Sequence, residues 1–318
     1  MILNLLYTSK ANQIKFGMLI MLLLGCVISA AWINILTNKA NSLNDINKSL
    51  KTVRDTTARS LDIWFENKKL ITNHISSDKQ LISMVERLLK LPVITETIVT
   101  NSVTTDIREY HHKHKKLIGE LGFFIINMES FNIGSIRDED IGSTNVVSIQ
   151  RPELIKKVFN GATVFVPPVY SYVDLNKSDM TNAKGSAQKI VTMFIVSPIT
   201  NADGEIIAAF AINLDPESEF SKLLYPGRIG KTGETYSIDS KGFLISESRF
   251  TNQLISIGLL AENQSSILSI KVLDPGVNLV EGIKSNSIEK PELTAMAISV
   301  INGDSKINTV GYRDYKRG

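Results

Sequence analysis

The first strong pattern in the sequence is an unbroken apolar run near the N-terminus. The 23 residues 16–38 carry no charged side chain, and Lys15 and Lys39 flank them. A helix rises about 1.5 Å per residue, so about 20 residues cross a hydrocarbon core roughly 30 Å thick. Trp32 lies toward the far end of the run, where an indole ring favours a membrane interface. The run therefore predicts a transmembrane helix over residues 16–38.

The charges before this run predict its orientation. Lys10 and Lys15 precede it and no acidic residue does, which favours a cytoplasmic N-terminus over residues 1–15 and an extracytoplasmic remainder. Two alternatives are a signal peptide cleaved after the small residues 29–31 and a lipoprotein modified at Cys26. We favour the uncleaved anchor because the apolar run continues beyond both positions.

A helical pattern follows the apolar run. Apolar or small side chains recur every seven residues, and no glycine or proline interrupts residues 39–91; the stripe is Leu43, Leu50, Thr57, Trp64 and Ile71. Such spacing is typical of left-handed helix pairs. It predicts a helical stalk over residues 39–92, which either pairs in a homodimer or packs along its own domain.

A second helix is expected before Pro92. Ser77 and Gln80 have the spacing of a capping box, which predicts that this helix starts at Ser77. Proline disfavours helical geometry in the residue before it, so Pro92 ends the helix.

Beyond residue 92 the pattern changes to short strands and turns. Apolar runs predict strands at residues 121–128, 189–197 and 206–214, with a polar turn at 201–204. Residues 235–239 and 243–246 flank a second polar turn, and residues 152–159 have helical character. Strands joined by turns and interrupted by helices predict an α+β fold with antiparallel sheets.

The sequence also contains an internal repeat. A shift of 112 residues places Asn127 on Asp239, Phe131 on Phe243 and Arg137 on Arg249. The repeat predicts two tandem modules, 93–222 and 223–318, with the two arginines at equivalent strand ends. Chance similarity between two hairpins is the alternative.

The order of these elements resembles the double-Cache family of sensors, which carry two PAS-like modules on a long N-terminal helix. The resemblance covers about residues 14–318 and is carried by the anchor, the long helix and segments 135–142, 193–199, 204–215 and 227–250. It implies an extracytoplasmic small-ligand sensor of a membrane-bound signalling receptor. A histidine kinase is the first expectation for the output domain, and a nucleotide cyclase or a chemoreceptor is the alternative.

The resemblance also has departures. Family members return to the membrane and reach an output domain, so the second module is expected to be truncated at Gly318. The amino-acid-binding subgroup carries an Arg-x-Trp-Tyr run in its distal module. Trp32 and Trp64 are the only tryptophans, so amino-acid recognition of that kind is not expected.

Composition excludes several kinds of function. The 35 basic and 32 acidic residues give a net charge of +3, which offers no concentrated basic face for nucleic acid. Cys26 is the single cysteine, so neither an internal disulfide nor a multi-thiolate zinc site is expected. Gly230-Lys231-Thr232 is not a phosphate loop, because Tyr225 stands where that motif needs a glycine.

The histidine cluster 111–114 is surrounded by lysines, which oppose a bound cation, so it predicts a solvated loop or helix face. We expect no catalytic site, no cofactor and no metal in this chain. An enzyme is therefore the least favoured class, behind a membrane-tethered binding module without signalling output.

Four residues of the membrane-distal module are candidate ligand contacts. Arg137 suits a bidentate bond to a carboxylate. Tyr170 and Tyr172 follow two prolines and are placed to cover a ligand, and Asp174 suits an amine or a hydroxyl. The structural alternatives are that Arg137 pairs with neighbouring acidic residues and that the tyrosines belong to the core. We expect the protein in the inner membrane, with the sensor region periplasmic or extracellular.

Overall fold

The structure is a computed structural model that describes residues 10–173, 188–282, 291–304 and 314–316. Its internal contacts divide the chain into two units. One unit comprises Met1–Arg54 and Lys306–Gly311, and its described part is the N-terminal portion of a helix. The other comprises Asp55–Ser305 and Tyr312–Gly318, and it contains the sheet and every other described element.

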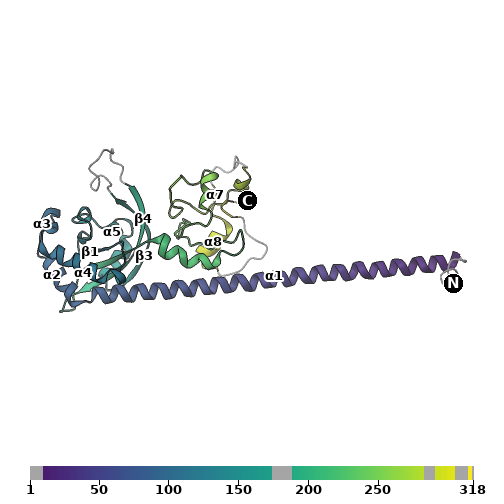
Figure 1. Ribbon diagram of the computed structural model, residues 1–318, viewed down its shortest axis with the longest axis horizontal. Coiled ribbons are helices and arrows are strands. Elements are labelled where there is room, and N and C mark those ends of the chain that lie inside the picture. The colour runs from purple at the N-terminus through teal and green to yellow at the C-terminus, as the bar shows by residue number, and fades with distance from the viewer. Residues whose placement is uncertain (1–9, 174–187, 283–290, 305–313, 317–318) are drawn as a thin grey trace. The chain divides into compact units, whose positions relative to one another are not determined.

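The N-terminal helix α1 extends without a break over Lys10–Ser76, a length of 67 residues (Figure 1). The predicted membrane helix and the predicted stalk as far as Ser76 are therefore one continuous helix. The side chains of residues 16–38 are exposed, and an 18-residue window of the helix has a mean hydropathy of 2.4. By length and composition, α1 is able to cross a membrane.

The C-terminal part of α1 packs against the sheet of the second unit. The Trp64 ring contacts Phe165 and Phe220 edge-on, at centroid distances of 6.1 and 5.8 Å. Leu43 and Leu50, at the other end of the seven-residue stripe, are exposed. Of the two predicted alternatives, packing along its own domain holds for the later part of the stripe.

A polar cluster links the end of α1 to the sheet; Ser76 and Ser197 are buried, and Asn73 and Thr163 are half-buried. The Oγ atoms of Ser76 and Ser197 are 3.1 Å apart, and Ser197 Oγ donates to Asn73 Oδ1 at 2.7 Å. Thr163 Oγ1 also donates to Asn73 Oδ1, at 2.5 Å. These four side chains thus bond one another where α1 meets the sheet, and the two buried serine hydroxyls have the partners that buried polar groups need.

Three helices follow α1: α2 (Lys79–Leu88), α3 (Thr95–Val99) and α4 (Ser102–Ile118). The predicted start of the second helix at Ser77 was wrong. Asp78 is the N-cap, because its Oδ1 accepts a bond from Gln80 N at 2.7 Å. An aspartate caps as well as a serine, and its second oxygen also accepts a bond from the Tyr110 hydroxyl.

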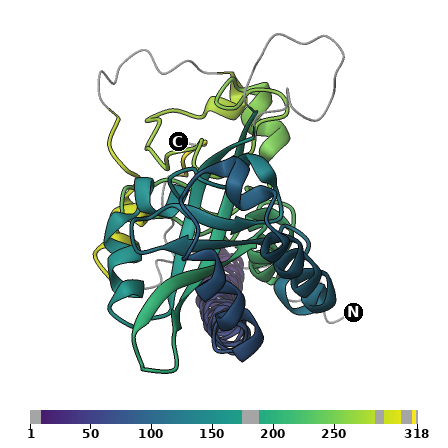
Figure 2. The same ribbon diagram turned by 90° about the vertical axis from the view of Figure 1, so that its left-hand side faces the viewer.

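The sheet has five antiparallel strands in the order β2-β1-β5-β4-β3. Figure 2 shows the strands of this sheet with helices beside them. The strands are β1 (Phe123–Asn127), β2 (Asn132–Ser135), β3 (Val164–Val173), β4 (Gln188–Thr200) and β5 (Ile206–Leu214). Helices α5 (Val146–Gln150) and α6 (Pro152–Phe159) connect β2 to β3. This order is that of a PAS-like sheet, and the predicted α+β class is confirmed.

Apolar side chains cover both faces of the sheet, as the twofold alternation of strand side chains requires. Phe123 and Ile125 belong to one cluster together with residues of α2 and α4, while Phe124 and Ile126 belong to a second cluster with residues of α6. In β3 the register shifts between Val166 and Val169. Two prolines, which lack the N–H that a ladder needs, occupy this shift.

The chain after β5 is less regular. It contains η3 (Pro216–Phe220), η4 (Ser221–Gly227), α7 (Thr251–Ser256), η5 (Leu279–Glu281) and α8 (Ala295–Ile301). The described residues after 227 form three isolated β-bridges and no strand. A second sheet, expected from the internal repeat, is therefore not formed within this described part. The same residues nevertheless bury an apolar cluster of their own, which includes Leu244 and Leu254.

The two turns of the internal repeat have the same hydrogen bonds. The side chain of Asn127 accepts a bond from Phe131 N at 2.8 Å, and Asp239 accepts the same bond from Phe243 N at 2.8 Å. In each turn the backbone N–H of the first residue donates to the carbonyl of the last at 2.9 Å. The repeat thus corresponds to two turns of one geometry.

Candidate functional site

Tyr170 is held at three points on the outer strand β3. Its backbone N–H donates to Gln150 Oε1 at 3.1 Å, and its carbonyl accepts a bond from Gln150 Nε2 at 2.5 Å. Its hydroxyl donates to the carbonyl of Leu268 at 2.9 Å. The side chain therefore joins the sheet to the loop of residues 263–269, which follows α7 in the chain.

A pocket of about 420 Å³ lies beside this tyrosine. Its walls come from β3 and β4, from the start of η3 and from the 263–269 loop: Tyr170, Ile190, Val191, Asp215, Pro216, Glu217, Asn263, Gln264, Ser265, Ile267 and Ser269. Small-molecule sites usually measure about 300–1,000 Å³ and combine apolar walls with a few polar groups. The pocket has both properties.

Glu247 holds the loop wall of the pocket in place. Its Oε2 accepts bonds from Ser265 Oγ at 2.6 Å and from Ser266 N at 3.2 Å, and its Oε1 accepts one from Thr251 Oγ1 at 2.8 Å. Leu268 has a φ of +60°, a left-handed geometry that is unfavourable for a bulky residue. Such backbone geometry persists where the surroundings over-determine it, and here Tyr170 and Glu247 supply those contacts.

The charged side chains that line the pocket are carboxylates. Asp215 caps η3: Oδ1 accepts a bond from Glu217 N at 2.9 Å and Oδ2 accepts one from Ser218 Oγ at 2.6 Å. Burial raises the pKa of Glu217, and the neighbouring charges of Glu247 and Asp215 raise it further. A carboxylate in such surroundings is stabilised by a positive group placed against it, so the electrostatics favour a ligand that carries a cationic part.

Arg137, the first predicted contact, does not line this pocket. Its Nε lies 2.8 Å from Asp140 Oδ2 and its Nη2 lies 3.0 Å from Asp140 Oδ1. Ser135 Oγ donates to the same carboxylate at 2.9 Å. The arginine thus has an intramolecular bidentate partner, as in the structural alternative.

Of the other predicted contacts, Tyr170 lines the pocket. Tyr172 pairs through its backbone with Lys189 in the sheet, and its side chain lies outside the described part. Asp174 also lies outside the described residues. Of the four predicted ligand contacts, Tyr170 is therefore the one whose described side chain lines the pocket.

Sequence reasoning missed most of the lining. Asp215 directly follows a predicted strand and precedes a proline, which is a helix-start signal that could have been noticed. The polar run of residues 263–266 gives no local indication of a site, because it comes near β3 only in the folded chain.

The histidine cluster differs in part from the prediction. His112 is exposed, but His111 is buried in α4 and its Nε2 lies 3.3 Å from the carbonyl of Gly119. Burial lowers the pKa of His111. Its ring packs against Phe123 at a centroid distance of 5.3 Å, so this histidine belongs to the core. Within the described residues, no group of three or more His, Cys, Asp or Glu side chains is placed to hold a metal ion.

The sheet and its covering helices form one PAS-like α+β module, and the described residues do not form the second PAS-like sheet that the resemblance to double-Cache sensors implies. No protein-family model and no curated protein matches the chain. The chain is similar to the sensor domain of the Vibrio cholerae histidine kinase DctB, with 15% identity over 64% of this chain and 67% of that one, at a TM-score of 0.42. It is also similar to the periplasmic domain of Vibrio cholerae LuxQ, with 10% identity over 63% and 78% of the two chains, at a TM-score of 0.37.

A third similar structure is the periplasmic sensory domain of the Campylobacter jejuni chemoreceptor Tlp1. It has 14% identity over 72% of this chain and 82% of that one, at a TM-score of 0.32. The strand order β2-β1-β5-β4-β3 of the chain itself defines the PAS-like fold.

Proposed function

We propose that this chain is the extracytoplasmic small-ligand sensor region of a membrane-bound signalling receptor. The observation that supports it is the pocket of about 420 Å³, whose walls combine the edge of a PAS-like sheet with the 263–269 loop. Tyr170 connects these two walls through its bond to Leu268. A ligand in the pocket contacts both walls at once.

A sensor needs a ligand that binds two arrangements of the protein unequally. The hydroxyl of Tyr170 bonds the loop wall to the sheet edge, while Glu247 fixes the loop to its own region. A ligand that bridges the walls stabilises the arrangement in which they are held together. Its differential affinity sets how far the equilibrium moves.

Helix α1 supports the membrane part of the proposal. Its apolar portion is long enough to anchor the chain, and the lysines before it favour an inside N-terminus. The exposed apolar residues Leu43, Ile46 and Leu50 share one helix face, which we assign to contact with a second copy in a homodimer. A histidine kinase is the output we favour, ahead of a cyclase or a chemoreceptor.

A ligand screen tests the pocket. The full chain in detergent is titrated calorimetrically with small amines, carboxylates and purines, and the strongest binder is carried into variants. Tyr170→Phe removes the hydroxyl that holds the loop wall, so we expect binding to weaken about 5–10-fold, the scale of one hydrogen bond. Tyr225→Phe, at an exposed tyrosine outside the lining, is the matched control.

A second pair of variants separates this pocket from a site centred on Arg137. If Arg137 contacts an anionic part of the ligand, Arg137→Ala weakens binding by about 1.5–3 kcal/mol while Arg249→Ala leaves it unchanged. If the pocket beside Tyr170 is the site, both arginine variants bind as the wild type does. If neither Tyr170→Phe nor Arg137→Ala weakens ligand binding, both placements of the site are contradicted.

Topology is tested separately. A reporter that is active only outside the cytoplasm, fused after Lys39, is expected to be active and to remain in the membrane fraction. Release of the fusion as a soluble protein would contradict the uncleaved anchor.

A further inference from the structure

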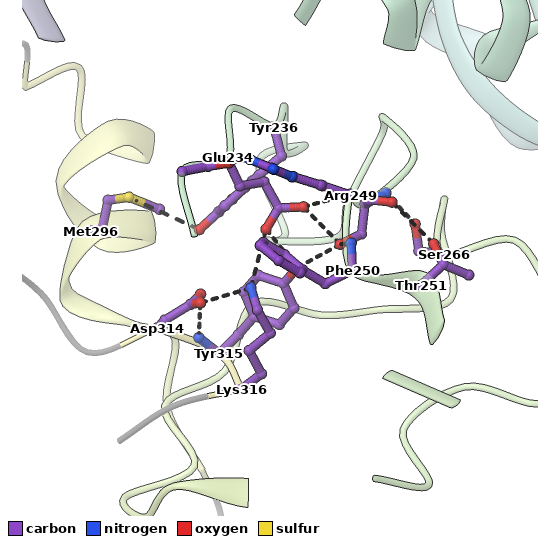
Figure 3. A network of polar contacts seen from close by, with 12 residues as sticks. Glu234, Tyr236, Arg249, Phe250, Thr251, Ser266, Met296, Asp314, Tyr315 and Lys316 are labelled. Carbon is purple, nitrogen blue, oxygen red and sulfur yellow. Dashed lines mark hydrogen bonds and ion pairs between the residues drawn. The ribbon is translucent and has the colours of Figure 1, made fainter. Parts of the chain in front are cut away.

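The side chain of Lys316 is buried in the C-terminal region, at 3% exposure (Figure 3). Its Nζ lies 3.1 Å from Glu234 Oε2 and 2.8 Å from Asp314 Oδ2. The same nitrogen lies 4.2 Å from the ring centroid of Phe250 and 4.5 Å from that of Tyr315. Two carboxylates and two aromatic rings therefore surround one ammonium group.

A buried ammonium needs such surroundings, since its removal from water costs several kcal/mol. Carboxylates offset this cost through charge-assisted hydrogen bonds, and aromatic faces attract the cation through their quadrupoles. The same chemistry recognises free amines. We call the set Glu234, Phe250, Asp314 and Tyr315 the ammonium cage.

Bonds that do not involve the lysine hold the carboxylate of Glu234. Its Oε1 accepts bonds from Ser248 Oγ and from Arg249 N, each at 2.7 Å. Arg249 in turn donates from Nη1 to the carbonyl of Gly233 at 2.6 Å. Arg249 thus supports the segment that carries Glu234, in contrast to Arg137, which pairs with a carboxylate.

The ring of Tyr315 is also held independently of the lysine. It packs edge-on against Tyr236, with centroids 5.7 Å apart, and its hydroxyl lies 2.9 Å from Ser248 Oγ. Burial, followed by the charge of Glu234, raises the pKa of Tyr315, so its hydroxyl keeps its proton and donates to Glu234 Oε2 at 3.2 Å. Glu234 and Tyr315 are therefore both positioned by contacts other than those to the lysine.

We propose that the ammonium cage is a binding site for a primary-amine group and that Lys316 is its intramolecular occupant. This site is separate from the pocket beside Tyr170 and does not depend on the proposed function. Because Lys316 is tethered, its effective concentration at the cage is high. A free alkylamine therefore fills the cage when the lysine side chain is removed.

Chemical rescue tests the proposal on the full chain in detergent. Lys316→Ala leaves Glu234 buried without its cation, and we expect the Tm to fall by roughly 5–15 °C. n-Propylammonium contains the three carbons and the nitrogen that this substitution removes. It is expected to restore the Tm with a saturable dose dependence, while n-propanol and propionate do not.

Lys271→Ala is the matched control, because Lys271 also lies near an aromatic ring, 5.6 Å from Phe243, but is exposed. Its Tm should not respond to n-propylammonium. Absence of rescue in Lys316→Ala, or equal rescue by n-propanol, would overturn the proposal.

If Lys316→Ala does not fold, Lys316→Met keeps an apolar stem without the charge. The cage predicts a lower Tm for Lys316→Met than for the wild type, and partial recovery when Glu234→Gln is added, because that change removes the unpaired charge. A Lys316→Met variant as stable as the wild type would show that only the stem is recognised, which also overturns the proposal.

Discussion

The turns at residues 127–131 and 239–243 have the same hydrogen bonds but lie in different surroundings. The first joins β1 to β2 within a five-stranded sheet, whereas the second is followed by a single bridge between Ile238 and Leu244. Turn geometry is thus encoded in the few residues of the turn. Strand length is not, since the same turn occurs with and without extended strands.

The difference lies in the neighbours. β1 pairs with β2 at three positions on one side and with β5 at five consecutive positions on the other. In the C-terminal region, the described residues beside Ile238 supply no strand equivalent to β5. An isolated hairpin is marginal in water, and three or more strands are needed for stable pairing. Local sequence similarity therefore predicts the turn and leaves the sheet to long-range partners.

The largest difference in stability between the two regions is expected from substitutions of their aromatic side chains. Phe194 in β4 is completely buried, so Phe194→Ala should lower the free energy of unfolding by about 3–5 kcal/mol. Phe243, at the second turn, is only partly buried, and Phe243→Ala should cost less than half as much. Urea unfolding of both variants measures the difference. Equal losses would mean that the two regions bury their aromatics equally well.

The next effect concerns one equivalent position in the two turns. Ser130 and Gly242 are related by the repeat and have φ angles of +73° and +82°. A Cβ on Gly242 would lie 2.3 Å from Leu293 Cδ2, so Gly242→Ala should cost about 1–3 kcal/mol.

Ser130→Gly should instead raise the free energy of unfolding by up to about 1 kcal/mol, because glycine adopts this φ without strain. Thermal unfolding of the two variants measures both signs. Destabilisation by Ser130→Gly would indicate that the serine side chain contributes more than its backbone strain costs.

A smaller effect is expected from the side chains that close the turns. Asn127→Ala and Asp239→Ala each remove an acceptor for a backbone N–H, and each should cost about 1–2 kcal/mol. The exchanges Asn127→Asp and Asp239→Asn retain an oxygen at the same place and should cost less than about half of this. Chemical denaturation distinguishes the pairs; a large cost for an exchange would contradict the equivalence of the turns.

The smallest expected effect is a pH dependence of the stability of the sheet region, which comes from His111. Because the folded-state pKa of His111 is lowered by burial, the unfolded chain takes up its proton more readily. The stability that this group contributes is fully present above its unfolded pKa of about 6.5, and it is lost as the pH falls below that value to the lower pKa of the folded state. His111→Gln should flatten this part of the pH dependence.

His74→Gln, at an exposed histidine of α1, is the control and should leave the curve as in the wild type. Measurement of urea midpoints from about pH 7 to 5 tests the pair. All four histidines lie before residue 115, so the effect belongs to the helices that cover the sheet.

Much of the fold was predictable from the sequence because its signals are local. The strand at residues 206–214 and the helix at 152–159 have the predicted bounds, since alternation and helical spacing are read within one element. The continuity of α1 across the two predicted segments was not foreseen. The apolar run indicated a membrane helix and the seven-residue stripe indicated a stalk, and neither pattern shows whether the two helices are joined.

The pocket was not predictable for a different reason. Its walls come from positions near 170, 190, 215 and 265, which no periodicity connects. Tyr170 was named as a candidate because it follows two prolines, and it lines the pocket. The cage around Lys316 was missed because nothing in the run 314–316 indicates that its lysine is buried.

The polar cluster of Asn73, Ser76, Thr163 and Ser197 has a mechanical consequence. If α1 slides along the sheet by a fraction of a turn, these hydrogen bonds break and the two buried serine hydroxyls lose their partners, which is costly. Small displacements are therefore opposed, and the cluster holds the end of α1 at one position along the sheet.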